Sequence, residues 1–164
     1  MDFWEGISVT EVERLTAIEA IKQVKSRYFR FGDTKDLVAM RELFTKDCVA
    51  DLSGSVTDPE TGIDIFPEVG SQVLYGVDAI MEAYGAGGGM RTVHHGYIPD
   101  IEITSATTAT AIFPMTDRLF FSEEYPIAGM IGYGHYHETY EKIGGKWLIK
   151  TLRLTRLRVE VVNR

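Results

Sequence analysis

The sequence predicts an α+β protein in which helices come first and a curved antiparallel sheet follows. In the N-terminal part, apolar residues recur every three or four positions, as on the buried face of a helix. From Met90 onward the apolar period becomes that of strands, and short turns separate the runs. Helices followed by strands in this order are typical of a sheet with helices packed on one face.

Length and composition indicate a single globular domain over residues 1–164. Apolar residues make up 45% of the chain and charged residues 25%, which is ordinary for such a domain. The formal net charge of −7 argues against a nucleic-acid partner, because such partners need a basic face. The one basic cluster is too small to reverse this; it comprises Arg153, Arg156, Arg158 and Arg164.

Cysteine and hydropathy patterns exclude other classes. Cys48 is the only cysteine, so an internal disulfide and a zinc–cysteine cluster are both excluded. No apolar run approaches membrane length, and the N-terminus lacks the basic and apolar regions of a signal peptide. We therefore expect a cytoplasmic protein without a membrane partner.

The first helix is predicted over residues 10–31. Thr10 can cap its start, with Glu13 placed three residues later as a capping box requires. Gly32 is predicted to end it, which places Asp33 just past the helix. The stripe predicted to be buried comprises Val12, Leu15, Ile18, Ile21, Val24, Tyr28 and Phe31.

A second part of shorter elements should follow. We expect helices over residues 36–44 and 77–84, and strands over residues 48–52 and 71–75. Residues 53–70 have the Gly, Pro and Asp content of a long loop, which in a compact domain is usually functional or contacts a partner.

The C-terminal half should be an antiparallel meander. The predicted strands cover residues 91–103, 107–121, 128–142 and 146–160, joined by short turns. We expect the pocket between this sheet and the first helix.

Two adjacent histidines on the first of these strands are candidates for chemistry. Neighbouring residues on a strand point to opposite faces, so either His94 or His95 should face the interior. An imidazole in an apolar interior is a candidate acid or base, since it titrates near neutrality. A purely structural role for either histidine is an equal alternative.

Four other polar residues fall on apolar faces or beside them. Asp117 stands on an otherwise apolar strand face, where it needs either a partner or a raised pKa. Arg156 would either neutralise Asp117 or bind a substrate oxygen, unless it is a solvated edge charge. Considered without a partner, the position of Tyr28 indicates a core tyrosine, and the position of Asp33 indicates a turn residue.

His135 and His137 share one strand face, two residues apart, as metal ligands can. No carboxylate or cysteine is grouped with them, so we expect no metal site. Lining of an aromatic pocket or packing at a subunit contact is the preferred interpretation. The strand from residue 129 to residue 143 would suit an interface between subunits.

Several tracts together resemble the SnoaL-like members of the nuclear transport factor 2-like superfamily. They are the spacing from Tyr28 to Asp33, TVHHGYIPDIEI (92–103), FPMTDRLFF (113–121), GYGHYHETYEKIGGKW (132–147) and LRLTRLRVE (152–160). The resemblance covers nearly the whole chain. It implies a cone-shaped α+β barrel of the cystatin-like type, with the sheet curved around N-terminal helices and a deep apolar pocket.

Within that superfamily the chain looks like the dehydratase and isomerase branch, which includes scytalone dehydratase and bile acid 7α-dehydratase. Matching motif to motif, the resemblance implies an Asp–His dyad of Asp33 and His94, with Tyr28 one helical turn before the aspartate. It places a further aspartate at Asp117 and an arginine at Arg156.

The resemblance implies a cofactor-independent dehydratase acting on a hydrophobic cyclic substrate such as a steroid or polyketide. An isomerase that uses the same dyad is the nearest alternative. A non-catalytic small-molecule-binding protein and a structural subunit like the small subunit of a dioxygenase are the others. Related enzymes suggest a homo-oligomer, either a trimer or a dimer.

Overall fold

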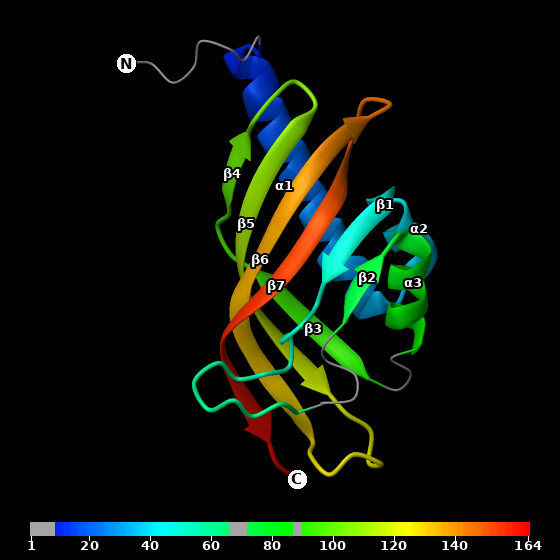
Figure 1. The fold of residues 1–164 in the computed structure, drawn as a ribbon, viewed down its shortest axis with the longest axis vertical. Helices are drawn as coiled ribbons and strands as arrows, with labels where there is room; N and C mark the ends of the chain where they lie inside the picture. The colour runs from blue at the N-terminus through cyan, green and yellow to red at the C-terminus, as the bar shows by residue number, and fades with distance from the viewer. Residues whose placement is uncertain (1–8, 66–71, 87–89) are drawn as a thin grey trace.

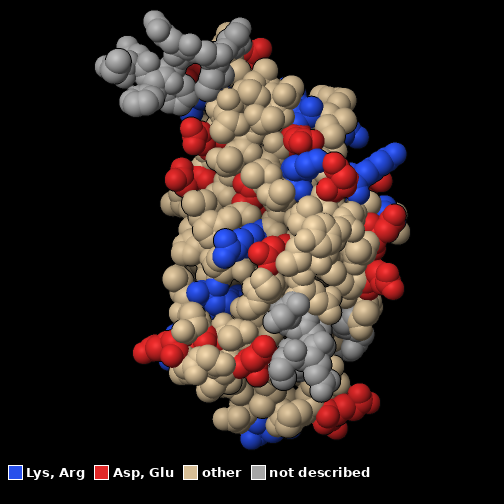
Figure 2. All heavy atoms as spheres, viewed as in Figure 1, with Lys and Arg blue, Asp and Glu red and all other residues tan. Residues whose placement is uncertain are grey.

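The computed structural model of the protein describes residues 9–65, 72–86 and 90–164. Long strands form a curved, unclosed sheet, and the first helix runs along one face of it (Figure 1). The order of helical and strand patterns predicts this α+β architecture, the resemblance implies its cone shape, and the predicted fold class is confirmed. Acidic and basic side chains are interspersed on the face seen in Figure 2, without a continuous tract of either sign.

Helix α1 (Glu11–Thr34) begins where the sequence predicts and ends later. The capping box is present: the Glu13 backbone N–H donates to the Thr10 hydroxyl, and the Glu13 carboxylate accepts from the Thr10 backbone N–H at 2.8 Å. The prediction that Gly32 ends the helix is wrong. Lys35, with φ 59°, is the left-handed cap, and its N–H bonds to the carbonyls of Gly32 and Phe31. Asp33 therefore lies in the last helical turn.

The shorter elements lie close to their predicted positions. Helix α2 (Leu37–Arg41) starts after its N-cap Asp36, but it is shorter than predicted because strand β1 (Phe44–Asp51) already begins at Phe44. Strand β2 (Val73–Tyr75) and helix α3 (Val77–Ala86) follow.

Five strands form the C-terminal half, where the sequence predicts four. The predicted strand over residues 91–103 is divided into β3 (Arg91–Gly96) and β4 (Asp100–Ile103). Both pair with β5 (Thr108–Phe120), but between them three residues, 97–99, face only two on β5. Pro99 has no backbone N–H to continue the ladder, which explains the break.

The sheet has the order β2-β1-β7-β6-β5-β3. Strands β5, β6 (Gly129–Ile143) and β7 (Lys146–Val162) form the predicted antiparallel meander. Strand β1 pairs with β7 in parallel, which the sequence analysis did not anticipate.

The core lies between α1 and the concave face of the sheet. Ala17, Ile21, Val24 and Tyr28 of α1 are buried against inward side chains of the strands. Those side chains alternate along each strand, as a half-buried sheet requires. Among the described residues, no helix is both long enough and apolar enough to cross a bilayer.

Candidate active site

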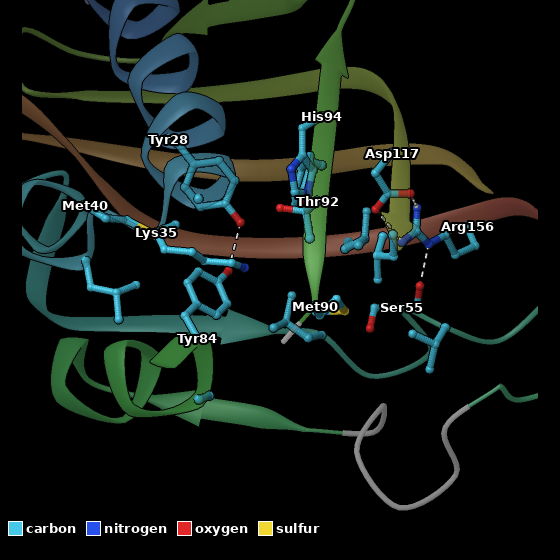
Figure 3. Close-up of a pocket in the computed structure, with 18 residues that line it drawn as sticks. Tyr28, Lys35, Met40, Ser55, Tyr84, Met90, Thr92, His94, Asp117 and Arg156 are labelled. Carbon is cyan, nitrogen blue, oxygen red and sulfur yellow. Dashed lines mark hydrogen bonds and ion pairs between the residues drawn. The ribbon is translucent and has the colours of Figure 1, made fainter. Parts of the chain in front are cut away.

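A cavity of about 190 Å³ lies between α1, α3 and the concave face of the sheet. Its wall is mostly apolar, and its polar groups come from six different elements, the cap residue after α1 and the loop after β1. In the view of Figure 3, His94 and Thr92 lie between a pair of tyrosines and an arginine–aspartate pair. The polar side chains that line it are Tyr28, Lys35, Ser55, Tyr84, Thr92, His94, Asp117, Tyr136 and Arg156.

His94 is held by Asp33 from the end of α1. The imidazole Nδ1 lies 2.6 Å from Asp33 Oδ1, and the His94 backbone N–H donates to Asp33 Oδ2 at 2.9 Å. The Thr92 hydroxyl also donates to Oδ1, at 2.8 Å. Because a carboxylate can only accept, Nδ1 carries the proton and Nε2 is the free nitrogen of a neutral ring.

These three hydrogen bonds determine the charge state of Asp33. Partial burial alone would raise its pKa, but the bonds from the His94 ring, the His94 backbone and Thr92 hold the pKa below its ordinary value. Asp33 is therefore a carboxylate at neutral pH. It can stabilise an imidazolium on His94.

The plane of the His94 ring is fixed by Phe29. The two rings stack with their centroids 5.6 Å apart and their planes inclined by 10°. Phe29 itself packs against Tyr28 and Tyr136. His95, the next residue on β3, is exposed on the other face of the sheet, so the predicted division between the two histidines is observed.

Two tyrosines from different helices meet at one side of the cavity. The hydroxyls of Tyr28, on α1, and Tyr84, on α3, are 2.8 Å apart (Figure 3). Burial raises the pKa of Tyr84 to about 12 and raises the pKa of Tyr28 well above its ordinary value, so both remain phenols. One of the two hydroxyls donates its proton to the other in this hydrogen bond. The second O–H of the pair can then be donated to a ligand.

Asp117 and Arg156 form a closed ion pair at the other side. Arg156 donates from Nη1 to Asp117 Oδ1 at 2.9 Å and from Nη2 to Oδ2 at 2.8 Å. Their side chains are 4% and 3% exposed. Of the two roles predicted for an inward Arg156, the structure contains the neutralising one. Gly132 makes room for the pair, because a Cβ there would lie 2.2 Å from Arg156 Nη1.

The loop after β1 closes this side of the cavity. The carbonyl of Ser55 accepts from Arg156 Nε at 2.5 Å, and Val56 is buried against Met130. The carboxylate of Asp58 ties the loop to β7 by accepting from the Val159 N–H at 2.8 Å. That bond and those from the loop backbone lower the pKa of Asp58 to about 2. Within the described part of the predicted loop, residues 53–65, Ser55 and Val56 thus line the site; residues 66–70 lie outside the described residues.

His135 and His137 lie on the sheet face away from the cavity, so of their two predicted roles pocket lining is wrong, and packing at a subunit contact stays a prediction. The His137 Nε2 lies 2.9 Å from the Thr155 hydroxyl, also on this outer face. Within residues 9–65, 72–86 and 90–164, no three potential metal ligands are grouped together.

All five candidate residues lie at or beside one cavity. Tyr28, His94, Asp117 and Arg156 line it, and Asp33 stands behind His94. Sequence reasoning missed Tyr84, whose signal was its place on the apolar stripe of the third helix, three residues after Met81. Ser55 gave no signal, because a backbone carbonyl is invisible in a sequence.

The fold and the site together define a class: an α+β cone whose interior holds an apolar cavity with a partly buried imidazole–carboxylate pair at its wall. Residues 13–153 match the SnoaL-like domain. This protein belongs to the SnoaL-like family, within the nuclear transport factor 2-like superfamily.

Solved structures with the same fold include enzymes. A candidate scytalone dehydratase from Novosphingobium aromaticivorans DSM 12444 is 22% identical, with a TM-score of 0.76 over 94% of this chain and 93% of that chain. A hexachlorocyclohexane dehydrochlorinase, LinA type 2, is 16% identical, with a TM-score of 0.74 over 93% of each chain. A Mycobacterium tuberculosis protein of unknown function, Rv3472, is 22% identical, with a TM-score of 0.69 over 91% of this chain and 77% of that chain.

Proposed function

We propose that this protein is a cofactor-independent lyase that eliminates water from a hydrophobic cyclic substrate. The observation that carries the proposal is the hydrogen bond of 2.6 Å between His94 Nδ1 and Asp33 Oδ1 beside an apolar cavity. It leaves Nε2 as an available base, and it places a carboxylate where an imidazolium needs one. The dehydratase and dehydrochlorinase folds among the similar structures are consistent with this chemistry.

In the proposed reaction, His94 Nε2 takes a proton from a carbon next to a carbonyl group. The electron pair of that C–H bond becomes the new C=C bond. The C–O bond to a hydroxyl on the next carbon breaks, and the hydroxyl leaves with the proton from the imidazolium. The products are an unsaturated carbonyl compound and water, and His94 returns to its neutral form.

The other residues that line the cavity would assist by hydrogen bonding. The free O–H of the Tyr28–Tyr84 pair would donate to the carbonyl oxygen, where negative charge develops during proton removal. Arg156 is already neutralised by Asp117, so it would position a substrate oxygen by a remaining N–H rather than supply a net charge.

The base role can be tested before the natural leaving group is known. A cyclic ketone without a leaving group is incubated with the protein in D₂O, and deuterium uptake at the carbon next to the carbonyl is followed by mass spectrometry. We expect catalysed uptake by the wild type and by His95→Ala, and none above background by His94→Ala. Equal uptake by His94→Ala and the wild type would contradict the assignment.

An isomerase is the second candidate, because the same base and the same tyrosines suffice for moving a double bond. Among the described residues that line the cavity, none supplies a group that only an elimination would need. Product mass separates the two reactions: elimination removes one water from the substrate, whereas isomerisation leaves the mass unchanged.

A further inference from the structure

A second hollow lies outside the cavity, between α1 and the part of the chain that runs from β3 into β4. Its volume is about 480 Å³, and we call it the α1–β3 cleft. Asp33 and His94 form part of its wall, and among the described residues only His94 lines both hollows. The cleft therefore reaches the imidazole–carboxylate pair separately from the cavity.

One stripe of α1 gives the cleft a positive rim. Lys22, Ser26 and Arg30 follow one another at four-residue intervals, so they lie on the same face of the helix. Lys22 and Arg30 are exposed, and neither has a carboxylate within 4.0 Å in the described part of the chain. Two uncompensated cations thus meet at one hollow of a protein whose formal net charge is −7.

The other charged groups of the cleft already have partners. Lys25 at its floor is buried, and its Nζ lies 2.5 Å from Glu138 Oε1. The Asp33 carboxylate is occupied by Thr92 and His94. Asp33 keeps its negative charge beside the neutral His94, but its two oxygens already accept from Thr92 and His94, and the two rim cations outnumber it.

The walls of the cleft are flat and apolar. Phe29, Pro99 and Phe113 contribute to them, together with Tyr97, which is 58% exposed although it is a large aromatic side chain. Ile98 beside it is 91% exposed. Aromatic walls below a cationic rim match a ligand with a flat apolar ring and one negative charge.

We propose that the α1–β3 cleft binds an aromatic carboxylate, with the ring between Tyr97 and Phe29 and the carboxylate between Lys22 and Arg30. This site is distinct from the cavity, and it does not depend on the proposed elimination. Its occupant lies against the same imidazole that faces the cavity, so it is placed to act as an effector of that residue.

The test uses NMR of the four histidine rings of the full chain while benzoate is added, with benzamide as the uncharged control. We expect benzoate to shift the His94 resonances and leave those of His135 and His137 unchanged. Benzamide should bind much more weakly, because it has the same ring and no charge.

Matched variants locate the site. Lys22→Gln and Arg30→Gln should each weaken benzoate binding about two- to fivefold, the value expected for one exposed ion pair. Arg27→Gln removes the same charge from the same helix at an exposed position outside the cleft, and should leave binding unchanged. Tyr97→Ala should weaken both benzoate and benzamide.

Three results would overturn the proposal. The first is equal affinity for benzoate and benzamide. The second is an equal effect of Arg27→Gln and Lys22→Gln. The third is a benzoate response at Met90 and Leu119, which line the cavity, that persists in Lys22→Gln and Arg30→Gln, because benzoate would then occupy the cavity and not the cleft.

Discussion

Two carboxylates stand close to the same cavity, and each is matched to a different kind of base. Asp33 pairs with an imidazole, is partly exposed, and receives further bonds from Thr92 and the His94 backbone. Asp117 pairs with a guanidinium through two bonds and is almost wholly buried. Both acids were found in the sequence as polar residues near an apolar stripe or face.

The difference shows how a partner decides what a carboxylate can do. A guanidinium does not release its proton in proteins, so the pair of Asp117 and Arg156 has one stable state and serves as a fixed dipole. An imidazole can both accept and release a proton, so the pair of Asp33 and His94 can pass between a neutral and a protonated ring during a reaction. The first pair shapes the cavity, whereas the second can carry a reaction.

The largest expected effect is on turnover in His94→Ala. Loss of a general base should lower kcat by about 10²–10⁴-fold. The side chain is near the edge of the core, so the protein should still fold. Rates from product formation by mass spectrometry, with His95→Ala as the exposed neighbour, check this. Unchanged kcat in His94→Ala would show that the pair of Asp33 and His94 does not carry the reaction.

A large stability effect is expected in Arg156→Met, which leaves the buried Asp117 without its partner. The free energy of unfolding should fall by about 3–5 kcal/mol, as when one member of a buried pair is removed. The double variant Asp117→Leu with Arg156→Met should recover most of this loss, because no charge is then buried. Urea unfolding measures both. If the double variant were no more stable than the single one, the loss would not come from an unpaired charge.

A smaller effect on rate is expected in Asp33→Asn, which keeps the shape and removes the charge. Loss of a charged hydrogen bond costs about 1.5–3 kcal/mol, or about ten- to hundredfold in kcat.

The pKa of Asp33 is lowered in the folded state, so the stabilisation from its charge is present above its ordinary pKa of 3.8 and is lost as pH falls through the folded value. The stability difference from the wild type should therefore shrink below about pH 4 in unfolding measured across pH. A constant difference would contradict the charge assignment.

The smallest effect is expected in Asp58→Ala. This change releases from β7 the loop whose Ser55 carbonyl accepts a hydrogen bond from Arg156. The Val159 N–H loses its acceptor, so its hydrogen exchange should become faster, while the exchange of Trp147 at the far end of β7 should not change. KM should rise more than kcat falls, because the loop lines the cavity without reaching His94. Unchanged exchange at Val159 would show that the loop is held by other contacts.

Local signals in the sequence located most of the elements. The capping box of Thr10 and Glu13 depends on adjacent residues only, and it was confirmed. The inward position of Asp117 follows from alternation along a single strand, and it is observed as well. Both are properties of a short stretch of chain.

Features that depend on distant contacts were not predicted. Gly32 looked like a helix end, but Asp36 begins α2 so soon afterwards that Lys35 must make the turn. The division between β3 and β4 depends on how both pair with β5. Tyr84 enters the cavity only because α3 packs beside β1, a contact between segments far apart in the chain.

The parallel pairing of β1 with β7 has a consequence for the order of assembly. Phe44 pairs with Ile149, so forming this pair costs the conformational entropy of closing a long loop. Strands β5, β6 and β7 are joined by short turns, so their pairing costs less loop entropy. The meander should therefore form early, and β1 should dock onto it late. A nascent chain that has not yet emerged as far as β7 would hold His94 and Asp33 without Arg156, and would expose the apolar face that later encloses the ligand.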